Sequence, residues 1–457
     1  MYKNTYLLLM SFSLLLTMAC KSSQQAATTP AIAPSKTVDW SRNLSIYEVN
    51  TRQYSKEGTF AAVDADLPRL KKMGVGIVWF MPITPIGEKG RKGAMGSYYA
   101  VKDYMAVNPD YGTIEEFARL VEHAHELGMY VIIDWVGNHT AVDNRLTETN
   151  PEWYTKDEKG NFVPPVADWS DVIDLNYDQQ ELRQYMIEAL RFWVKTCDID
   201  GFRVDVAEMV PTDFWVQARQ ELDKTKKMFW LAEGEKPELH QKAFDATYGW
   251  EMHHLLKDVA QGSKNASDIY KCIDKTAANF PSDAYKLYFT TNHDENSWNG
   301  TEKEKFGAGA AAMFVLSATI PMSMPLLYTA QESALDHRLK FFEKDPVDWR
   351  DYPLQGFYTA LLQLKNRNKA LLNGSWGGKM TRLKTSNETA TMAYTRQNGT
   401  DKILVILNLS DKPQDISITG NALKGAYNNI FDEKSKTFGE EEKLSLSPWE
   451  YQVWEMK

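Results

Sequence analysis

Short apolar runs alternate with amphipathic segments along most of the chain. The runs are rich in Val, Ile, Phe and Trp, whereas the segments between them repeat an apolar residue every three or four positions. Strands joined by crossover helices produce this alternation. We expect strands at residues 46–50, 76–81, 130–136, 201–206, 228–232, 243–247, 286–291 and 326–329.

Eight strand-and-helix units favour an α/β fold, a closed (β/α)8 or TIM barrel, over an open doubly wound sheet. A glycine-rich phosphate loop is missing after the first strand, which further disfavours a nucleotide-binding sheet. The helix after that strand is predicted to start at Phe60 and to end at Gly74. A capping box, Thr113 to Glu116, predicts the start of the helix before the third strand.

The periodicity changes in several places and divides the chain. We expect a signal peptide at 1–20, a flexible tether at 21–38 and the barrel at 39–371. Within the barrel, residues 138–178 lose their periodicity and predict an excursion subdomain after the third strand, because loops this long are usually functional. Short alternating stretches with Asn-Gly turns predict an all-β sandwich at 372–457.

The first residues form a targeting segment. Lys3 supplies a positive charge, the run from Tyr6 to Met18 is apolar, and the stretch that closes at Cys20 resembles a bacterial lipoprotein box. We therefore expect an exported protein that is lipid-anchored to the cell envelope through Cys20. A plain secretory peptide is the alternative, since Thr17 departs from the usual Leu of such a box.

Composition excludes some partners. The chain has 457 residues, of which 43% are hydrophobic and 25% charged, as in soluble globular proteins. The net charge is −9, and the basic residues form no block, so a nucleic-acid partner is disfavoured. Cys197 and Cys272 lie in apolar surroundings, outside any metal-type cluster, and are predicted to be buried thiols.

Three acidic residues follow apolar strand-like runs and carry the candidate chemistry. They are Asp205 in GFRVD, Glu233 in MFWLAE and Asp294 in YFTTNHD. A barrel displays its active site at the carboxyl ends of its strands, so these side chains are expected to meet there. Carboxylates that meet in one pocket suit glycosidic-bond chemistry, which needs a proton donor and an anionic partner for an oxocarbenium-like centre.

Four segments resemble, in order, those of the α-amylase family (glycoside hydrolase family 13). They are DWVGNHT at 134–140, GFRVDVAEM at 201–209, LAEGE at 231–235 and TTNHDE at 290–295. The resemblance implies hydrolysis of α-1,4-glucosidic bonds in starch-derived maltooligosaccharides, with retention of the anomeric configuration. An α-glucan transglycosylase, an α-1,6-active relative and a non-catalytic glucan-binding lipoprotein remain as alternatives.

The resemblance also implies roles for the acids. Asp205 would be the nucleophile, and Glu233 the general acid and base, with its pKa raised by an apolar wall. Asp294 would hold sugar hydroxyls and stabilise the transition state. Arg203, two residues before the nucleophile on the same strand face, would keep Asp205 ionised. The alternative for Arg203 is a structural ion pair with Asp134.

Further residues would bind the substrate. The resemblance implies that Tyr99 stacks beneath the glucosyl ring and that His139 and His293 donate hydrogen bonds to it. Two positions depart from the family pattern, at Ser97 and at 208–209, where Glu-Met stands in place of Lys-His. These departures affect substrate length and bond preference, and leave the chemistry in place.

A structural Ca²⁺ ion is a further expectation from the resemblance. Asn138 and Asp174 match positions that often bind Ca²⁺ in the family, and hard oxygen ligands suit that ion. A hydrogen-bonded pair that pins the excursion to the barrel is the alternative.

Three aromatic residues, Trp153, Tyr154 and Trp169, lie in the excursion. We expect two of these three to form its small core.

Overall fold

The computed structural model describes residues 37–432 and 434–457. The predicted signal peptide, most of the tether and the lipidation site at Cys20 lie outside the described residues. In the described part of the chain, no helix combines the length and the apolar character needed to cross a membrane.

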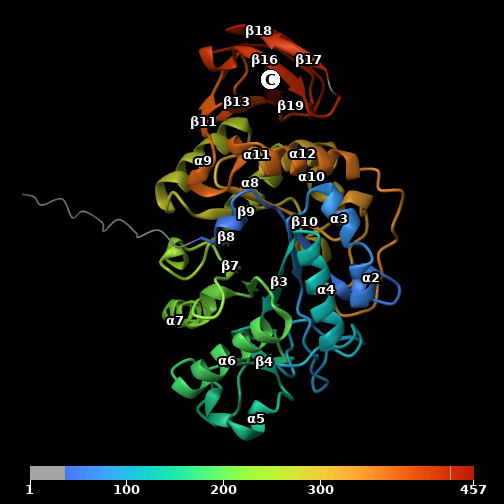
Figure 1. Ribbon diagram of the computed structural model, residues 1–457, viewed down its shortest axis with the longest axis vertical. Helices are drawn as coiled ribbons and strands as arrows, with labels where there is room; N and C mark the ends of the chain where they lie inside the picture. Colours follow the sequence, from blue (N-terminus) through green and yellow to red (C-terminus); the bar gives the residue numbers. More distant parts are fainter. Residues whose placement is uncertain (1–36, 433) are drawn as a thin grey trace, which may run out of the picture. The chain divides into compact units, whose positions relative to one another are not determined.

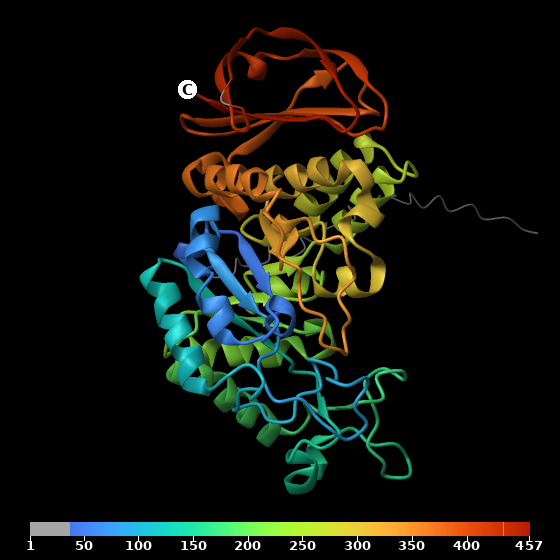
Figure 2. The same ribbon diagram turned by 90° about the vertical axis from the view of Figure 1, so that its right-hand side faces the viewer.

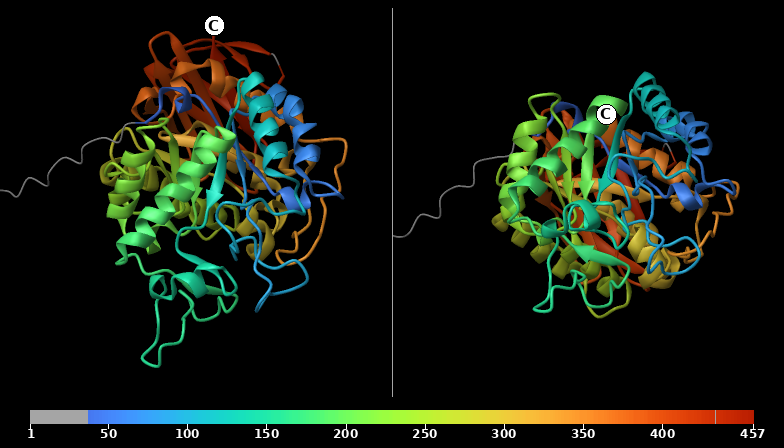
Figure 3. Two further views of the ribbon diagram at one scale, coloured as in Figure 1. Left: turned by 60° about the horizontal axis from the view of Figure 1, so that its bottom comes forward. Right: turned by 90° about the horizontal axis from the view of Figure 1, so that it is seen from below.

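Eight parallel strands close into a barrel, which confirms the predicted fold class (Figure 1 and Figure 3, right). Their order around the barrel is β1, β10, β9, β8, β7, β6, β3 and β2. The bounds are Ile46–Val49 (β1), Ile77–Phe80 (β2), Tyr130–Trp135 (β3), Gly201–Val204 (β6), Phe229–Ala232 (β7), Ala246–Tyr248 (β8), Tyr285–Tyr288 (β9) and Ser323–Tyr328 (β10). Each predicted strand overlaps one of these.

Most helices cover the outside of the barrel, whereas the short helix at 146–149 belongs to the excursion. Among the described residues the helices are Thr51–Tyr54 (α1), Phe60–Asp64 (α2), Leu67–Met73 (α3), Ile114–Glu126 (α4), Leu146–Thr149 (α5), Gln180–Cys197 (α6), Thr212–Leu222 (α7), Trp250–Ala260 (α8), Ala266–Asn279 (α9), Glu302–Phe306 (α10), Ala310–Thr319 (α11) and Gln355–Arg367 (α12). The capping box at the start of α4 is present, with Thr113 and Glu116 each bonded to the other's backbone amide.

The single helix predicted from Phe60 is wrong, because the structure divides it into α2 and α3. The break falls at Ala65 and Asp66, and Pro68 stands in the first turn of α3. Proline lacks a backbone N–H and fits only the first turn of a helix, so the chain starts a new helix here. Gly74 ends α3 as predicted, in a left-handed conformation with φ of 101°.

The excursion contains β4 (His139–Ala141) and β5 (Val172–Asp174), which pair antiparallel, together with α5. Trp153 and Tyr154 are buried, 7% and 2% exposed, and join the main core. Trp169 is half-buried and packs against a smaller cluster. Two of the three excursion aromatics are therefore core residues, as expected, but they join the main core and not a separate small core of the excursion.

The C-terminal residues form the expected all-β domain, with a six-stranded and a three-stranded antiparallel sheet (red in Figure 2). Its strands are Lys379–Arg382 (β11), Lys384–Thr385 (β12), Thr391–Asn398 (β13), Asp401–Asn408 (β14), Gln414–Thr419 (β15), Gly425–Asn429 (β16), Ser435–Phe438 (β17), Glu441–Leu446 (β18) and Tyr451–Met456 (β19). Arg396 of β13 donates a 2.8 Å hydrogen bond to the carbonyl of Thr319, at the end of α11.

Buried side chains form two main layers in the barrel. Inside it, Ile46, Trp79, Leu231 and Leu287 belong to one compact cluster. Between the strands and the helices lies a larger cluster, to which Cys197 contributes. Both Cys197 and Cys272 are buried free thiols, and burial raises the pKa of Cys272 to about 11.

Gly201 opens β6 where a side chain has no room. A Cβ added there would lie 2.1 Å from the carbonyl oxygen of Phe229 in β7. Since both groups belong to hydrogen-bonded strands, neither can move away without breaking the ladder. We expect Gly201→Ala to lower the free energy of unfolding by roughly 3 kcal/mol or more, as measured by urea denaturation.

The matched control is Gly356→Ala in α12, where an added Cβ would meet nothing within 4 Å. This variant should keep its stability or gain up to about 1 kcal/mol, because alanine has the higher helix propensity. Equal effects of the two substitutions would contradict the close approach at Gly201.

Candidate active site

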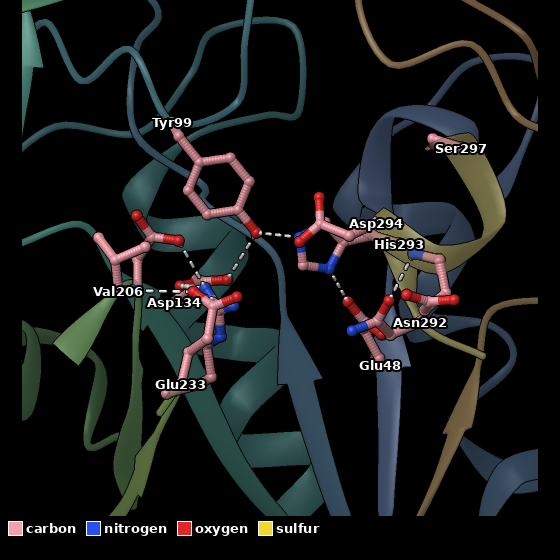
Figure 4. Close-up of polar contacts among 12 residues, drawn as sticks. Glu48, Tyr99, Asp134, Val206, Glu233, Asn292, His293, Asp294 and Ser297 are labelled. Atoms are coloured by element: carbon pink, nitrogen blue, oxygen red, sulfur yellow. Dashed lines mark hydrogen bonds and ion pairs between the residues drawn. The ribbon is translucent and has the colours of Figure 1, made fainter. Parts of the chain in front are cut away.

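The three predicted acids lie at one end of the barrel and line one cavity of about 440 Å³. Asp205 directly follows β6 and Glu233 directly follows β7, whereas Asp294 lies six residues beyond the end of β9. Tyr99 and His139 line the same cavity. The structure therefore brings together residues that are far apart in the sequence (Figure 4).

A buried guanidinium joins the acids on one side of the cavity. Arg203 Nη1 donates to Asp134 Oδ1 at 2.9 Å and to Asp205 Oδ1 at 3.0 Å. Its Nη2 lies 3.0 Å from Glu233 Oε2, an ion pair that lacks the alignment of a hydrogen bond. The side chain of Arg203 is fully buried. Asp134 and Arg203 also face each other in the β3–β6 register, so the predicted structural ion pair is present.

One cation, Arg203, thus contacts three carboxylates. This excess of negative charge is reflected in the pKa values of Asp134 and Asp205. Burial raises the pKa of Asp134 to about 6, against the opposing charge of Arg203. Burial also raises the pKa of Asp205, the negative charge of Glu233 adds to the effect, and Arg203 opposes it. Arg203 therefore acts on the pKa of Asp205 in the predicted direction, but burial outweighs it.

Glu233 has polar surroundings, unlike the apolar wall expected from the sequence. Its Oε2 accepts a 2.8 Å hydrogen bond from the backbone N–H of Val206, besides facing Arg203. Val206 has φ of 37° and ψ of 47°, a left-handed conformation that is unusual for a β-branched residue. Such strain is often found at functional sites. Here it turns the amide next to Asp205 towards Glu233.

His293 organises the opposite side of the cavity. Its Nδ1 lies 2.5 Å from Glu48 Oε1, and its Nε2 lies 3.3 Å from Asp294 Oδ2. Although burial alone would lower it, Asp294 and then Glu48 raise the pKa of His293 well above its usual value. In turn, burial would raise the pKa of Asp294, but the His293 cation outweighs it and lowers that pKa.

The Tyr99 hydroxyl links the two sides, as Figure 4 shows. It donates to Asp134 Oδ2 at 3.1 Å and lies 2.7 Å from His293 Nε2. The Tyr99 ring is parallel to that of Phe341, with centroids 6.2 Å apart. Ser97, one of the departures from the family pattern, accepts a hydrogen bond from the Tyr99 amide at 3.1 Å and so fixes its backbone.

His139 is buried at the edge of the excursion. Burial lowers the pKa of His139 to about 4, so its ring is neutral at physiological pH. The ring stands edge-on to Trp169 at 5.5 Å, and both side chains line the cavity. A neutral imidazole can donate one hydrogen bond to a sugar hydroxyl, which fits the predicted role.

Sequence reasoning missed Glu48 and Tyr248. Glu48 is fully buried in the middle of β1 and binds His293, and Tyr248 accepts a 3.2 Å hydrogen bond from Arg203 Nε. A charged residue inside the apolar run Ile-Tyr-Glu-Val was a usable signal for Glu48, because such a residue is rarely buried without a partner. Tyr248 gave no signal, since aromatic residues are ordinary in strands.

Calcium stays a prediction. Backbone pairing places Asn138 and Asp174 close together, as the Leu175 N–H donates to the Asn138 carbonyl at 3.1 Å. The Asp174 carboxylate already accepts a 2.6 Å hydrogen bond from Thr155. In the described part of the chain, no three His, Cys, Asp or Glu side chains form a metal-sized group. The two side chains alone fall short of the six to eight oxygens that Ca²⁺ prefers.

Comparison with protein families gives two matches. The model "Alpha amylase, catalytic domain" matches residues 42–165 and 149–401, so it includes all three acids. The model "Alpha-amylase SusG C-terminal domain" matches residues 391–451, within the C-terminal sheets.

Individual relatives agree with these models. Alpha-amylase MalA of Haloarcula japonica is 25% identical over 415 residues, which cover 86% of this chain and 58% of that protein. The chain thus spans less than two thirds of that relative's length. A solved noncanonic maltogenic alpha-amylase, AmyB of Thermotoga neapolitana, is 32% identical with a TM-score of 0.82, over 91% of this chain and 98% of that one.

An alpha-amylase structure from Lactobacillus plantarum is also 32% identical, with a TM-score of 0.81, and the match covers 91% of this chain and 99% of the other. The catalytic-domain model covers most of the chain, and the acids that it includes meet in one cavity. On these grounds the chain belongs to the α-amylase family of glycoside hydrolases.

Proposed function

We propose that this enzyme hydrolyses α-1,4-glucosidic bonds in starch-derived maltooligosaccharides by a retaining double displacement. The observation that carries the proposal is the meeting of Asp205, Glu233 and Asp294 in one cavity, with Asp205 and Glu233 on the same guanidinium. The names of similar proteins support it, since they include alpha-amylase and maltogenic alpha-amylase.

In the first step, Asp205 attacks the anomeric carbon of the bound glucosyl unit. The bond from that carbon to the glycosidic oxygen breaks, and Glu233 gives its proton to the leaving oxygen. Asp205 becomes covalently bonded to the sugar. The Val206 amide holds Oε2 of Glu233 and leaves Oε1 for the glycosidic oxygen.

In the second step, water attacks the same carbon and Glu233 takes the proton of that water. Asp205 then leaves with the electron pair of the covalent bond, which restores the free enzyme. Asp294 stabilises positive charge on the ring in both transition states, and His293 keeps it ionised by lowering its pKa. Tyr99 lies beneath the ring, and its hydroxyl is fixed by Asp134 and His293.

The anchor is part of the proposal. A lipid on Cys20 would hold the enzyme at the cell envelope, where it would release fragments of glucan for uptake.

Glycosyl transfer is the second candidate function, since an α-1,4-glucan:maltose-1-phosphate maltosyltransferase from Salinibacter ruber is 26% identical over 88% of this chain. Incubation with maltotriose alone separates the two activities, because a transferase makes longer chains and a hydrolase only shorter ones.

Removal of either reacting carboxylate should abolish turnover. We expect Asp205→Asn and Glu233→Gln each to lower kcat/KM on maltoheptaose at least ~10³-fold, since each loses a bond-making or proton-transferring group. Reducing-sugar release measures the rates, and thermal unfolding checks that the variants fold. The controls are Asp411→Asn and Glu158→Gln, both at exposed positions. Near-normal rates in the two active-site variants would overturn the assignment.

The first product should keep the α configuration. Carboxylates bound to neighbouring nitrogens of one guanidinium lie close together, as in the retaining arrangement, where the carboxyl groups are about 5–5.5 Å apart. Proton NMR during the first minutes of maltoheptaose hydrolysis should show the α-anomer before mutarotation. A β-anomer at that stage would exclude the double displacement.

The acid side of the pH profile should depend on His293. The pKa of Asp294 is depressed by this cation, so the ionised carboxylate is present at ordinary pH and is lost only as pH falls through that low pKa. In His293→Gln the cation is gone, so the pKa values of Asp294 and Asp134, both of which it lowers, rise. We expect the acid limb of kcat/KM to move to higher pH.

The control for this profile is His254→Gln, because His254 is exposed and packs on Trp250 outside the cavity. Its acid limb should match that of the wild type. An unchanged acid limb in His293→Gln would contradict the role given to His293.

A further inference from the structure

Residues 90–96, here called the strap, lie in the connection between β2 and α4 and contribute Lys92 to the wall of the cavity. On the excursion side, Lys92 Nζ donates to the Asp168 carbonyl at 2.7 Å and lies 3.2 Å from Asp171 Oδ1. Lys92, Asp168 and Asp171 all line the catalytic cavity. The strap is therefore tied to the excursion at the cavity wall.

The other side of the strap is tied to the segment after β10. The Met95 amide donates to the Phe342 carbonyl at 2.9 Å, and the Ala94 amide donates to Glu343 Oε1 at 3.0 Å. At Gly93 the two segments are so close that an added Cβ would lie 2.6 Å from Phe342 Cβ. Both views of Figure 3 show the orange segment after β10 beside the blue segment after β2.

A buried arginine, Arg52, holds the strap through hydrogen bonds to its backbone carbonyls. Arg52 Nη1 donates to the Gly96 carbonyl at 3.0 Å and to the Phe341 carbonyl at 2.9 Å, and Nη2 reaches the Met95 carbonyl at 3.3 Å. The guanidinium also lies 3.8 Å above the Tyr98 ring. These contacts fix the strap and the segment after β10 to the same cation, so the folded structure holds the strap in place.

The barrel order places the strap opposite Glu233. In the order β1, β10, β9, β8, β7, β6, β3, β2, strand β7 is four steps from β1 in either direction. The strap follows β2 and binds the segment after β10, and these two strands flank β1. Glu233 follows β7 directly. The strap and the proton donor therefore stand on opposite sides of the barrel mouth.

This position has a chemical consequence. Glu233 protonates the leaving oxygen, so the leaving part of the glucan, which carries the reducing end, lies on the Glu233 side. The non-reducing part must then lie on the opposite side, where it meets the strap. The wall continues through Phe342 to Trp298, whose ring packs against Phe341 and Phe342 with centroids 5.2 and 5.8 Å away.

We propose that the strap closes the non-reducing end of the catalytic cavity, so that the enzyme attacks glucans from a free non-reducing end and releases short products. This inference rests on the proposed function and names the part of the substrate that the site accepts. A long glucan cannot pass through the closed side, whereas a chain end can enter from the Glu233 side.

The test compares two maltoheptaosides, one with a free non-reducing glucose and one with 4,6-O-ethylidene on that glucose. Loss of each substrate is followed by chromatography. The wild type should consume the free substrate at least ~10²-fold faster than the blocked one. Similar rates on both overturn the closure while the proposed function stands. Loss of neither substrate overturns the proposed function and the inference with it.

Substitutions in the strap and in the neighbouring wall test whether the strap causes the closure. Lys92→Ala removes the contact between the strap and the excursion, and Phe342→Ala shortens a side chain of the cavity wall. Both substitutions should therefore raise the rate on the blocked substrate, relative to the rate on the free one, several-fold. Lys102→Ala is the matched control, because Lys102 pairs with Glu88 and Asp143 outside the catalytic cavity. It should keep the wild-type ratio. An unchanged ratio in both Lys92→Ala and Phe342→Ala overturns the assignment.

Hydrolysis of amylose, a natural substrate without a blocking group, gives a second measurement of attack from chain ends. Attack from chain ends releases reducing sugar while the iodine colour persists, whereas internal cleavage destroys the colour early. The wild type should show the first behaviour, and Lys92→Ala should lose colour earlier for the same sugar release. Early loss of colour in the wild type overturns the closure.

Discussion

The active site depends on one buried guanidinium. Arg203 contacts Asp134, Asp205 and Glu233 from inside the barrel, and its own side chain is fully buried. A buried ion pair pays a large desolvation cost, and removal of one partner leaves an uncompensated charge. Asp134, Asp205 and Glu233 are therefore held at the guanidinium, because moving any of them away would leave a buried charge without its partner. Because Asp134, Arg203 and Leu231 share one register across β3, β6 and β7, the sheet itself fixes this arrangement.

A second charge group complements the first. His293 lies between Glu48 and Asp294, and the Tyr99 hydroxyl reaches both His293 and Asp134. The first group carries excess negative charge, whereas the second keeps Asp294 ionised. The cavity thus holds carboxylates whose pKa values are pushed in opposite directions, upwards at Asp205 and downwards at Asp294, a pattern typical of sites that carry out acid–base chemistry. Because the Tyr99 hydroxyl contacts both Asp134 and His293, the protonation of the Arg203 group and that of the His293 group depend on each other.

The sequence predicted the barrel because its strands are short, buried and rich in β-branched and aromatic residues. It also predicted the three acids, since each follows an apolar run and the ends of parallel strands meet. It contained a usable signal for the break at Asp66, because Pro68 fits only the first turn of a helix, but the continuous apolar period favoured a single helix instead. It could not predict the surroundings of Glu233, because the Val206 amide reaches it only through a left-handed backbone that local pattern does not encode.

The strap shows why substrate length is harder to predict than chemistry. The acids follow strands, whose positions are set by the barrel. The strap, in contrast, is fixed by contacts between residues 76 and 247 positions apart in the sequence, Lys92 with Asp168 and Met95 with Phe342. Under the proposed closure, an open side opposite Glu233 would let the same acids cut a glucan internally. The barrel thus positions the acids that carry the chemistry, and the loops around its mouth determine how much of the substrate can lie on each side of them.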